Sequence, residues 1–145
     1  MESLRIDTGV KRVMINDDPN RVIVFNPSDV AFAERFYRLI GEFQDKQAEY
    51  QRRAEELEQN AVVNENGIPS NLAESLALLR EACEFLRAKI DDLFGAGTSD
   101  KVFGDALSLD AFEQFFEGIT PFVQTARSDK MTRYVSKKVS GRVMK

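Results

Sequence analysis

Apolar and polar residues follow two kinds of pattern along this chain, and each predicts a different element. Near the N-terminus, residues 12–16 and 21–25 are short runs rich in β-branched side chains, and the polar residues 17–20 between them favour a turn. Residues 4–6 are candidates for a further short strand. We expect a β-hairpin or a short meander within residues 1–27, packed on a helix or another subunit because an isolated hairpin is marginally stable.

Two long stretches carry apolar residues at alternating spacings of four and three, which is typical of amphipathic helices with a heptad stripe. Ser28 is the expected N-cap of the first helix, with Phe32 at the start of its stripe, and the second should span about residues 70–94 and end at Gly95. The first stripe comprises Phe36, Ile40, Phe43, Gln47, Tyr50, Ala54 and Leu57. The second comprises Leu72, Leu76, Leu79, Cys83, Leu86, Ile90 and Leu93.

A loop over residues 60–69 joins the two stretches, so they predict an antiparallel helical hairpin or one half of a bundle formed between subunits. The stripe weakens after Asp45, where most other residues are charged or amides, and this half of the first helix should be exposed. The residues that we expect to form most of the core are Phe36, Ile40, Phe43, Leu79, Leu86 and Ile90.

A third helix, rich in phenylalanine, is predicted to begin at Ser108. A connector with glycines precedes it over residues 95–105, with a single helical turn at 99–103. Gly118 and Pro121 are expected to break or kink the third helix. Its apolar face comprises Phe112, Phe115, Phe116 and Ile119, and Phe122 prolongs it.

These elements predict a mainly α protein of the α+β class. The expected order is an N-terminal β-hairpin or short meander, a long helical hairpin and a Phe-rich third helix. Residues 1–126 should form a single domain, with the hairpin in 1–27 and the helical part in 28–126. Residues 127–145 should be a basic C-terminal tail, either helical or disordered until bound.

Composition narrows the functional classes. With 43% hydrophobic and 30% charged residues, the chain is typical of globular proteins. It has no apolar run near the roughly 20 residues that cross a bilayer, and its first residues lack the apolar segment of a secretory signal. The single cysteine, Cys83, gives no support for an oxidising compartment. We therefore expect a cytoplasmic protein without a membrane partner.

Histidine is absent, and with it the commonest general base and zinc ligand. Cys83 lies in an apolar stripe and should be a core residue, and the acidic residues 16–18 fit a hairpin turn better than a cation site. The glycines at 95 and 97 follow a predicted helix, whereas a phosphate loop follows a strand. We expect no enzyme activity, no catalytic residue, no cofactor and no metal.

Charge is unevenly distributed. From residue 127 onward there are seven basic residues and one acid, a net charge of +6, which leaves −10 on the rest of a chain whose total is −4. A small nucleic-acid-binding regulator that uses this tail is one alternative, although an acidic body would repel a polyanion and makes nucleic acid an unfavoured partner. The tail residues that we consider as contacts are Arg133, Tyr134, Lys137, Lys138 and Arg142.

The apolar stripes outnumber the surfaces that a small chain offers to cover them. A helical hairpin and one short helix cannot easily bury every stripe, so we expect one face to be buried against another chain, in a homo-oligomer or with a different partner. The Phe-rich helix is the best candidate for that face. Its expected partner-binding residues are Phe112, Phe115, Phe116, Ile119 and Phe122.

Two stretches resemble a known family. Residues 18–29 (DPNRVIVFNPSD), leading into Phe32, Arg35 and Phe36, are similar to the opening of small tail-assembly proteins of long-tailed bacteriophages that infect Gram-positive bacteria. Residues 90–105 (IDDLFGAGTSDKVFGD), followed by the Phe-rich segment 109–122, resemble the later part of the same proteins. The resemblance identifies the chain as a candidate tail assembly chaperone.

Such chaperones coat the long, aggregation-prone tape measure protein while the tail tube polymerises, and they do not remain in the virion. The resemblance thus implies a self-associating protein of the bacterial host cytoplasm, with the tape measure protein and also the tail tube protein as partners. In that family a programmed frameshift often gives a longer product as well. Capture of a partner helix in an apolar groove is the physical expectation. A virion tail or connector component is a further alternative.

Overall fold

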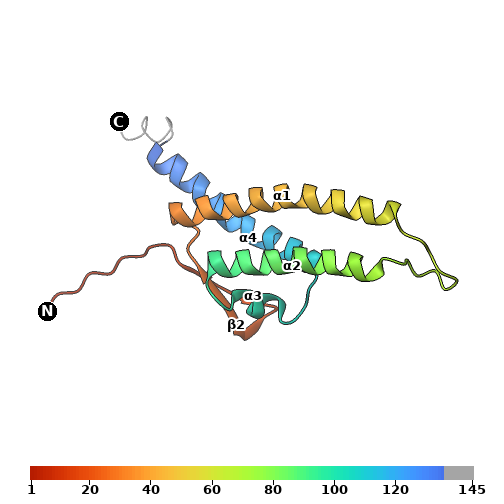
Figure 1. Cartoon of the computed structure of the whole chain (residues 1–145). Helices are drawn as coiled ribbons and strands as arrows, with labels where there is room; N and C mark the ends of the chain where they lie inside the picture. Colours follow the sequence, from red (N-terminus) through yellow and green to blue (C-terminus); the bar gives the residue numbers. More distant parts are fainter. Residues whose placement is uncertain (136–145) are drawn as a thin grey trace.

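An antiparallel hairpin, formed by β1 (Lys11–Ile15) and β2 (Asp18–Phe25), follows the extended N-terminal residues in the computed structural model, which describes residues 1–135 (Figure 1). Asn16 and Asp17 alone form the connection, both with positive φ, as a two-residue hairpin turn requires. The register shifts directly afterwards, so that Ile15 lies opposite Asp18 but Met14 opposite Val22. The predicted hairpin is confirmed, whereas residues 4–6 form no third strand.

The helical hairpin is also confirmed. It consists of α1 (Val30–Gln59) and α2 (Leu72–Phe94), which run antiparallel (Figure 1). The N-cap of α1 is Asp29 rather than Ser28, because the Asp29 carboxylate accepts a hydrogen bond of 2.9 Å from the backbone N–H of Ala31. Gly95 ends α2 with a positive φ of 113°.

Two further helices follow. The expected helical turn is α3 (Thr98–Phe103), and the Phe-rich helix is α4 (Leu109–Lys130), which is capped by Ser108 as predicted. A single π-helical turn, η1 (Met131–Val135), extends α4. The predicted boundary after residue 126 falls inside α4, so the first part of the basic tail is the last turn of this helix. Arg127 and Lys130 suit that position because the C-terminal end of a helix dipole is negative.

Of the break or kink predicted at Gly118 and Pro121, the break is wrong, because α4 continues through both residues. Core packing holds the helix on either side of the proline: Ile119 lies before it and the fully buried Val123 after it. The Thr120 hydroxyl donates a 2.6 Å hydrogen bond to the Phe116 carbonyl, a contact that tends to bend a helix, so it does not account for the continuity of α4. Tertiary burial thus outweighs the roughly 3 kcal/mol that a proline costs inside a helix.

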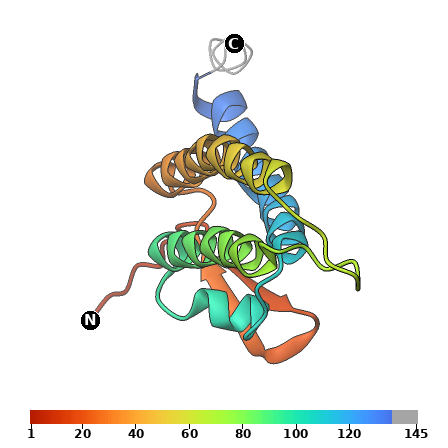
Figure 2. The same cartoon turned by 45° about the vertical axis from the view of Figure 1, so that its right-hand side comes forward.

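The core forms where α4 lies across the hairpin of α1 and α2 (Figure 2). Aromatic rings connect the elements there, with centroid distances of 5.3 Å for Phe94–Phe115, 6.4 Å for Phe36–Phe116 and 5.6 Å for Phe25–Phe122. The buried cluster comprises Ile23, Phe25, Phe32, Phe36, Leu39, Cys83, Leu86, Ile90, Leu93, Phe112, Phe115, Ile119 and Val123.

The expected core residues divide into buried, half-buried and exposed ones. Phe36, Leu86 and Ile90 are fully buried, and Ile40 and Phe43 pack half-buried against the cluster. The prediction for Leu79 is wrong, because 50% of this residue is exposed. Its neighbour Leu78 is buried instead, as is Ala82, so the covered face of α2 passes through these two residues here and Leu79 points away from it.

Polar contacts fix α3 against its neighbours. Arg21 of β2 donates hydrogen bonds of 2.6 and 2.7 Å to the carbonyls of Lys101 and Val102. The Asp91 carboxylate of α2 accepts from both the backbone N–H and the hydroxyl of the buried Ser99. As a result, α3 covers the outer side of β2. Within residues 1–135, no helix is both long and apolar enough to cross a membrane.

The two stripe leucines provide a matched test of this core. Leu86→Ala should lower the free energy of unfolding by about 2–5 kcal/mol, because it leaves a cavity in close-packed surroundings. Leu79→Ala removes the same atoms from a half-exposed site and should cost about 1 kcal/mol or less. Urea denaturation followed by circular dichroism measures both values. Equal losses of unfolding free energy in the two variants would contradict the burial of Leu86 and the exposure of Leu79.

The glycine in α4 provides a second test. A Cβ added at Gly118 would meet nothing within 4 Å. Gly118→Ala should therefore raise the free energy of unfolding by about 0.5–1 kcal/mol, because alanine loses less backbone entropy in a helix. Gly104→Ala is the control, since a Cβ there also meets nothing but the residue has a φ of +60°. That variant should be destabilised by about 1–2 kcal/mol. Thermal unfolding shows whether each substitution raises or lowers the stability of the protein.

Candidate partner-binding groove

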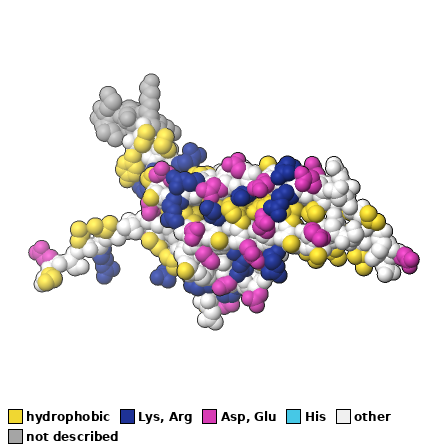
Figure 3. Space-filling view, in the orientation of Figure 1, with side chains coloured by type: hydrophobic (Ala, Val, Ile, Leu, Met, Phe, Trp, Pro, Cys, Tyr) yellow, Lys and Arg dark blue, Asp and Glu magenta, His cyan; other side chains and the backbone are white. Residues whose placement is uncertain are grey.

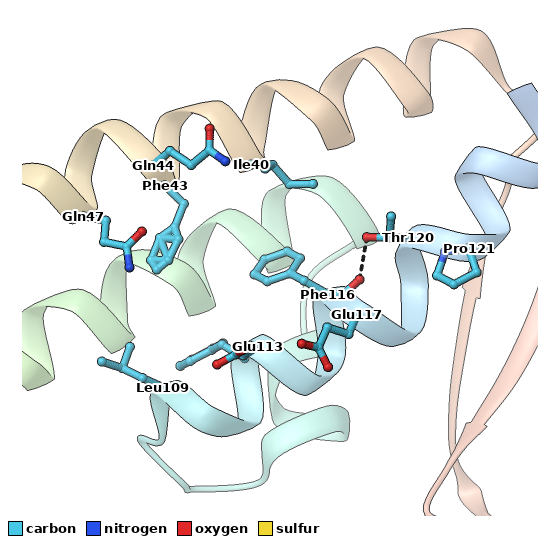
Figure 4. Close-up of a pocket in the computed structure, with 11 residues that line it drawn as sticks. Ile40, Phe43, Gln44, Gln47, Leu109, Glu113, Phe116, Glu117, Thr120 and Pro121 are labelled. Carbon is cyan, nitrogen blue, oxygen red and sulfur yellow. Dashed lines mark hydrogen bonds between the residues drawn. The ribbon is translucent and has the colours of Figure 1, made fainter.

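An open groove of about 640 Å³ lies between α1 and α4 (Figure 4). Its α1 wall is formed by Ile40, Phe43, Gln44 and Gln47, on successive turns of the helix. Its α4 wall is formed by Leu109, Phe112, Glu113, Phe116, Glu117, Thr120 and Pro121. We call this feature the α1–α4 groove. It exists because α4 packs on the core through one face and leaves its flank apart from α1.

The floor of the α1–α4 groove is apolar and its margin is polar. Phe43 and Phe116 point into the same space from opposite walls (Figure 4). Glu113 and Glu117 are both exposed and lie one helical turn apart on α4. They are the charged residues of the lining, so the groove has an acidic side. An apolar floor with an acidic margin suits an amphipathic helix that carries basic residues beside its apolar face.

The structure separates the five residues that were expected to bind a partner. Phe112, Phe115 and Ile119 are exposed by only 2%, 7% and 3% and pack mainly in the core, so they offer little surface themselves and their use as partner contacts stays a prediction. They are buried because α4 is itself the third layer of the core. Phe116 is half-buried in the groove wall, and Phe122 is 36% exposed beside the β-hairpin. These two remain available to a partner.

Several groove residues were not recognised as site residues in the sequence. Gln47 carried a signal, since it is a polar residue at an apolar position of the first stripe. A position that faces the core on one side and open space on the other tolerates such a residue. Leu109, Glu113 and Glu117 gave no comparable signal, because their role depends on where α4 meets α1.

The structure places part of the tail only. Arg133 and Tyr134 are exposed in η1, where the Arg133 guanidinium lies 5.9 Å and the Lys130 ammonium 5.7 Å from the centre of the Tyr134 ring. Both contacts are within the range of cation–π attraction. Lys137, Lys138 and Arg142 lie outside the described residues. The use of the tail as a contact site stays a prediction.

The remaining candidates for chemistry have structural roles. Cys83 is 2% exposed, and burial raises the pKa of its thiol, which lowers the fraction of reactive thiolate. Asn16 and Asp17 form the turn between β1 and β2, whereas residues 18–20, which were predicted to be part of the turn, belong to β2. Within residues 1–135, no three His, Cys, Asp or Glu side chains are grouped so that they could hold a metal ion.

A second apolar surface lies at the distal half of the helical hairpin. Leu72, Leu76 and Leu79 are exposed by 43%, 56% and 50% on one side of α2. In the space-filling view, hydrophobic side chains also gather along the seam between α1 and α2, bordered by charges of both signs (Figure 3). Arg53 and Glu81 bridge this part of the hairpin at 2.6 Å, which raises the pKa of the guanidinium and lowers that of the carboxyl.

Comparison with known proteins gives a family but no function. Neither the curated proteins nor the solved structures contain a match to this chain. One protein family matches residues 20–145, which include every helix and nearly all of β2. It is described as "Family of unknown function (DUF6673)", and because the match spans most of the sequence, the chain belongs to this family.

Proposed function

We propose that this protein is a non-enzymatic tail assembly chaperone of a long-tailed bacteriophage. It acts in the bacterial host cytoplasm, where it binds the tape measure protein while the tail is assembled. The observation that carries the proposal is the α1–α4 groove, an open channel with an apolar floor between two helices. The resemblance of residues 18–29 and 90–105 to such chaperones supports the same function.

The groove has the chemistry for capturing a helix. Helix-in-groove recognition places apolar residues at spacings of three and four into a hydrophobic channel. In the α1–α4 groove, Ile40, Phe43 and Phe116 supply apolar contacts. Glu113 and Glu117 favour a partner helix that carries basic residues beside its apolar face. A tape measure protein is long, helical and prone to aggregation, so many such segments need cover before the tube encloses them. The tail tube protein is a further partner in this proposal.

Leu109→Ser tests the groove directly. Leu109 is 38% exposed in the groove wall, whereas Leu107 is 37% exposed outside it, so Leu107→Ser is a control of the same type and exposure. Loss of one apolar contact should weaken binding of the tape measure protein about tenfold or more. Calorimetry with a soluble segment of the tape measure protein measures the affinity. The groove hypothesis fails if the two variants bind alike.

Charge reversal at the acidic margin of the α1–α4 groove tests whether the bound helix carries basic residues beside its apolar face. Glu113→Lys combined with Glu117→Lys should slow association of the tape measure protein and remove most of its salt dependence, because rim charges act mainly on the association rate. Glu55→Lys combined with Glu58→Lys changes net charge equally on the exposed part of α1, away from the groove. Surface plasmon resonance at several salt concentrations compares the pairs. Equal association rates would exclude a role for the acidic margin.

Co-expression with the tape measure protein tests the function itself. The chaperone hypothesis requires that the tape measure protein becomes more soluble and co-purifies with this chain. If neither occurs, the hypothesis is wrong. Salt-dependent binding of DNA or RNA that is lost on removal of residues 127–145 would instead favour the nucleic-acid-binding regulator. Recovery of the protein in purified particles would favour a tail or connector component.

A further inference from the structure

We propose that the N-terminal arm, residues 1–7, pairs as an added β-strand with the free edge of β1 in a second copy of this chain. In that position Leu4 and Ile6 enter an apolar cavity between the β-hairpin and α4 of the receiving copy. This is a specific surface for self-association. It does not depend on the tape measure protein, so the two proposals fail separately.

The N-terminal arm has the properties of an unpaired strand. It is extended and leads away from the body of the molecule (Figure 1). Leu4 and Ile6 are exposed by 83% and 75%, and they alternate with Arg5 and Asp7 in the period of two that gives a strand one apolar face. Hydrophobic side chains on the arm lie well away from the body (Figure 3). Nothing within the described chain covers them.

The receiving edge is the outer side of β1. On the side of β2, α3 packs against the strand, and the Lys101 ammonium donates a 3.4 Å hydrogen bond to the Val22 carbonyl. Among residues 1–135, β1 pairs with β2 alone. The outward N–H and C=O groups of such an edge are a template for another strand. A third strand would also stabilise a two-stranded sheet, which is marginal by itself.

An apolar cavity of about 350 Å³ adjoins this edge. Its walls include Val13 and Ile15 of β1 and Phe115, Ile119 and Phe122 of α4. Val13 and Ile15 lie on the half-buried face of the hairpin, so an added strand with its apolar face on the same side would continue this layer. Gly118 also lines the cavity, where the missing side chain leaves space that no group within residues 1–135 fills.

The direction of the chain favours an arm from a second copy. Gly9 lies so close to Ser28 that a Cβ on it would be 2.6 Å from the serine side chain, and the Asn26 amide donates a 2.8 Å hydrogen bond to the Thr8 carbonyl. These contacts fix the arm just before β1 begins at Lys11. To reach the outer edge of its own β1, the arm would have to reverse within one or two residues.

The first experiment measures self-association of the full chain by sedimentation velocity over a series of concentrations. Leu4→Ser combined with Ile6→Ser should weaken association about tenfold or more, because two apolar side chains lose their burial. Ser3→Ala combined with Arg5→Ser is the control on the opposite face of the arm, and it should associate like the wild type. Both pairs lie outside the core, so folding is preserved. The proposal is overturned if the wild type is monomeric throughout or if the two pairs associate equally.

A disulfide experiment identifies the site. A single Arg5→Cys variant is mixed with a single Arg12→Cys variant, since these positions lie on the polar faces of the arm and of β1, and the mixture is oxidised. Cys83 is buried and competes poorly. We expect a disulfide-linked pair of the two variants, in clear excess over a mixture of Arg5→Cys with Glu55→Cys on the distant part of α1. Equal yields would overturn the proposal, as would rapid closure within one chain of a double Arg5→Cys/Arg12→Cys variant at high dilution.

Discussion

Burial of the apolar face of α4 against the hairpin of α1 and α2 is the interaction on which the rest of the structure depends. Phe112, Phe115, Ile119 and Val123 enter the core from this helix. Where these residues pack, the molecule has three layers, formed by α1, α2 and α4. The part of the helical hairpin near the loop between α1 and α2 has only two layers. The same burial carries α4 past Pro121, because the helix is anchored on both sides of the proline.

Phenylalanine makes this arrangement possible at the point where the elements converge. Phe94, at the end of α2, lies within 5.3–5.6 Å of rings from β2, α1 and α4, namely Phe25, Phe32 and Phe115. Most of these contacts are edge-to-face, the geometry that ring quadrupoles prefer. One cluster of rings therefore joins the β-hairpin to the helices, and a small sheet that would be marginal alone gains a stable support.

The two candidate surfaces flank α4 and follow from its position. On one side it stands apart from α1 and opens the α1–α4 groove, with the floor of Phe43 and Phe116 and an acidic margin. On the other side it approaches the β-hairpin and leaves the cavity beside β1. A helix that is rich in phenylalanine can thus fill the core through its central stripe and still supply apolar walls to two neighbouring spaces.

The sequence by itself determined the elements: a hairpin around a short turn, two heptad-striped helices, a helical turn and a Phe-rich helix capped by Ser108. Periodicity and capping are local properties, so they can be read along the chain. Only the tertiary structure decided which stripe positions are buried. Leu79 and Leu86 occupy equivalent stripe positions, yet Leu86 lies in the core cluster whereas Leu79 is half-exposed and its neighbour Leu78 is buried instead. The α1–α4 groove likewise depends on the meeting of residues about 70 apart in sequence, which no local pattern encodes.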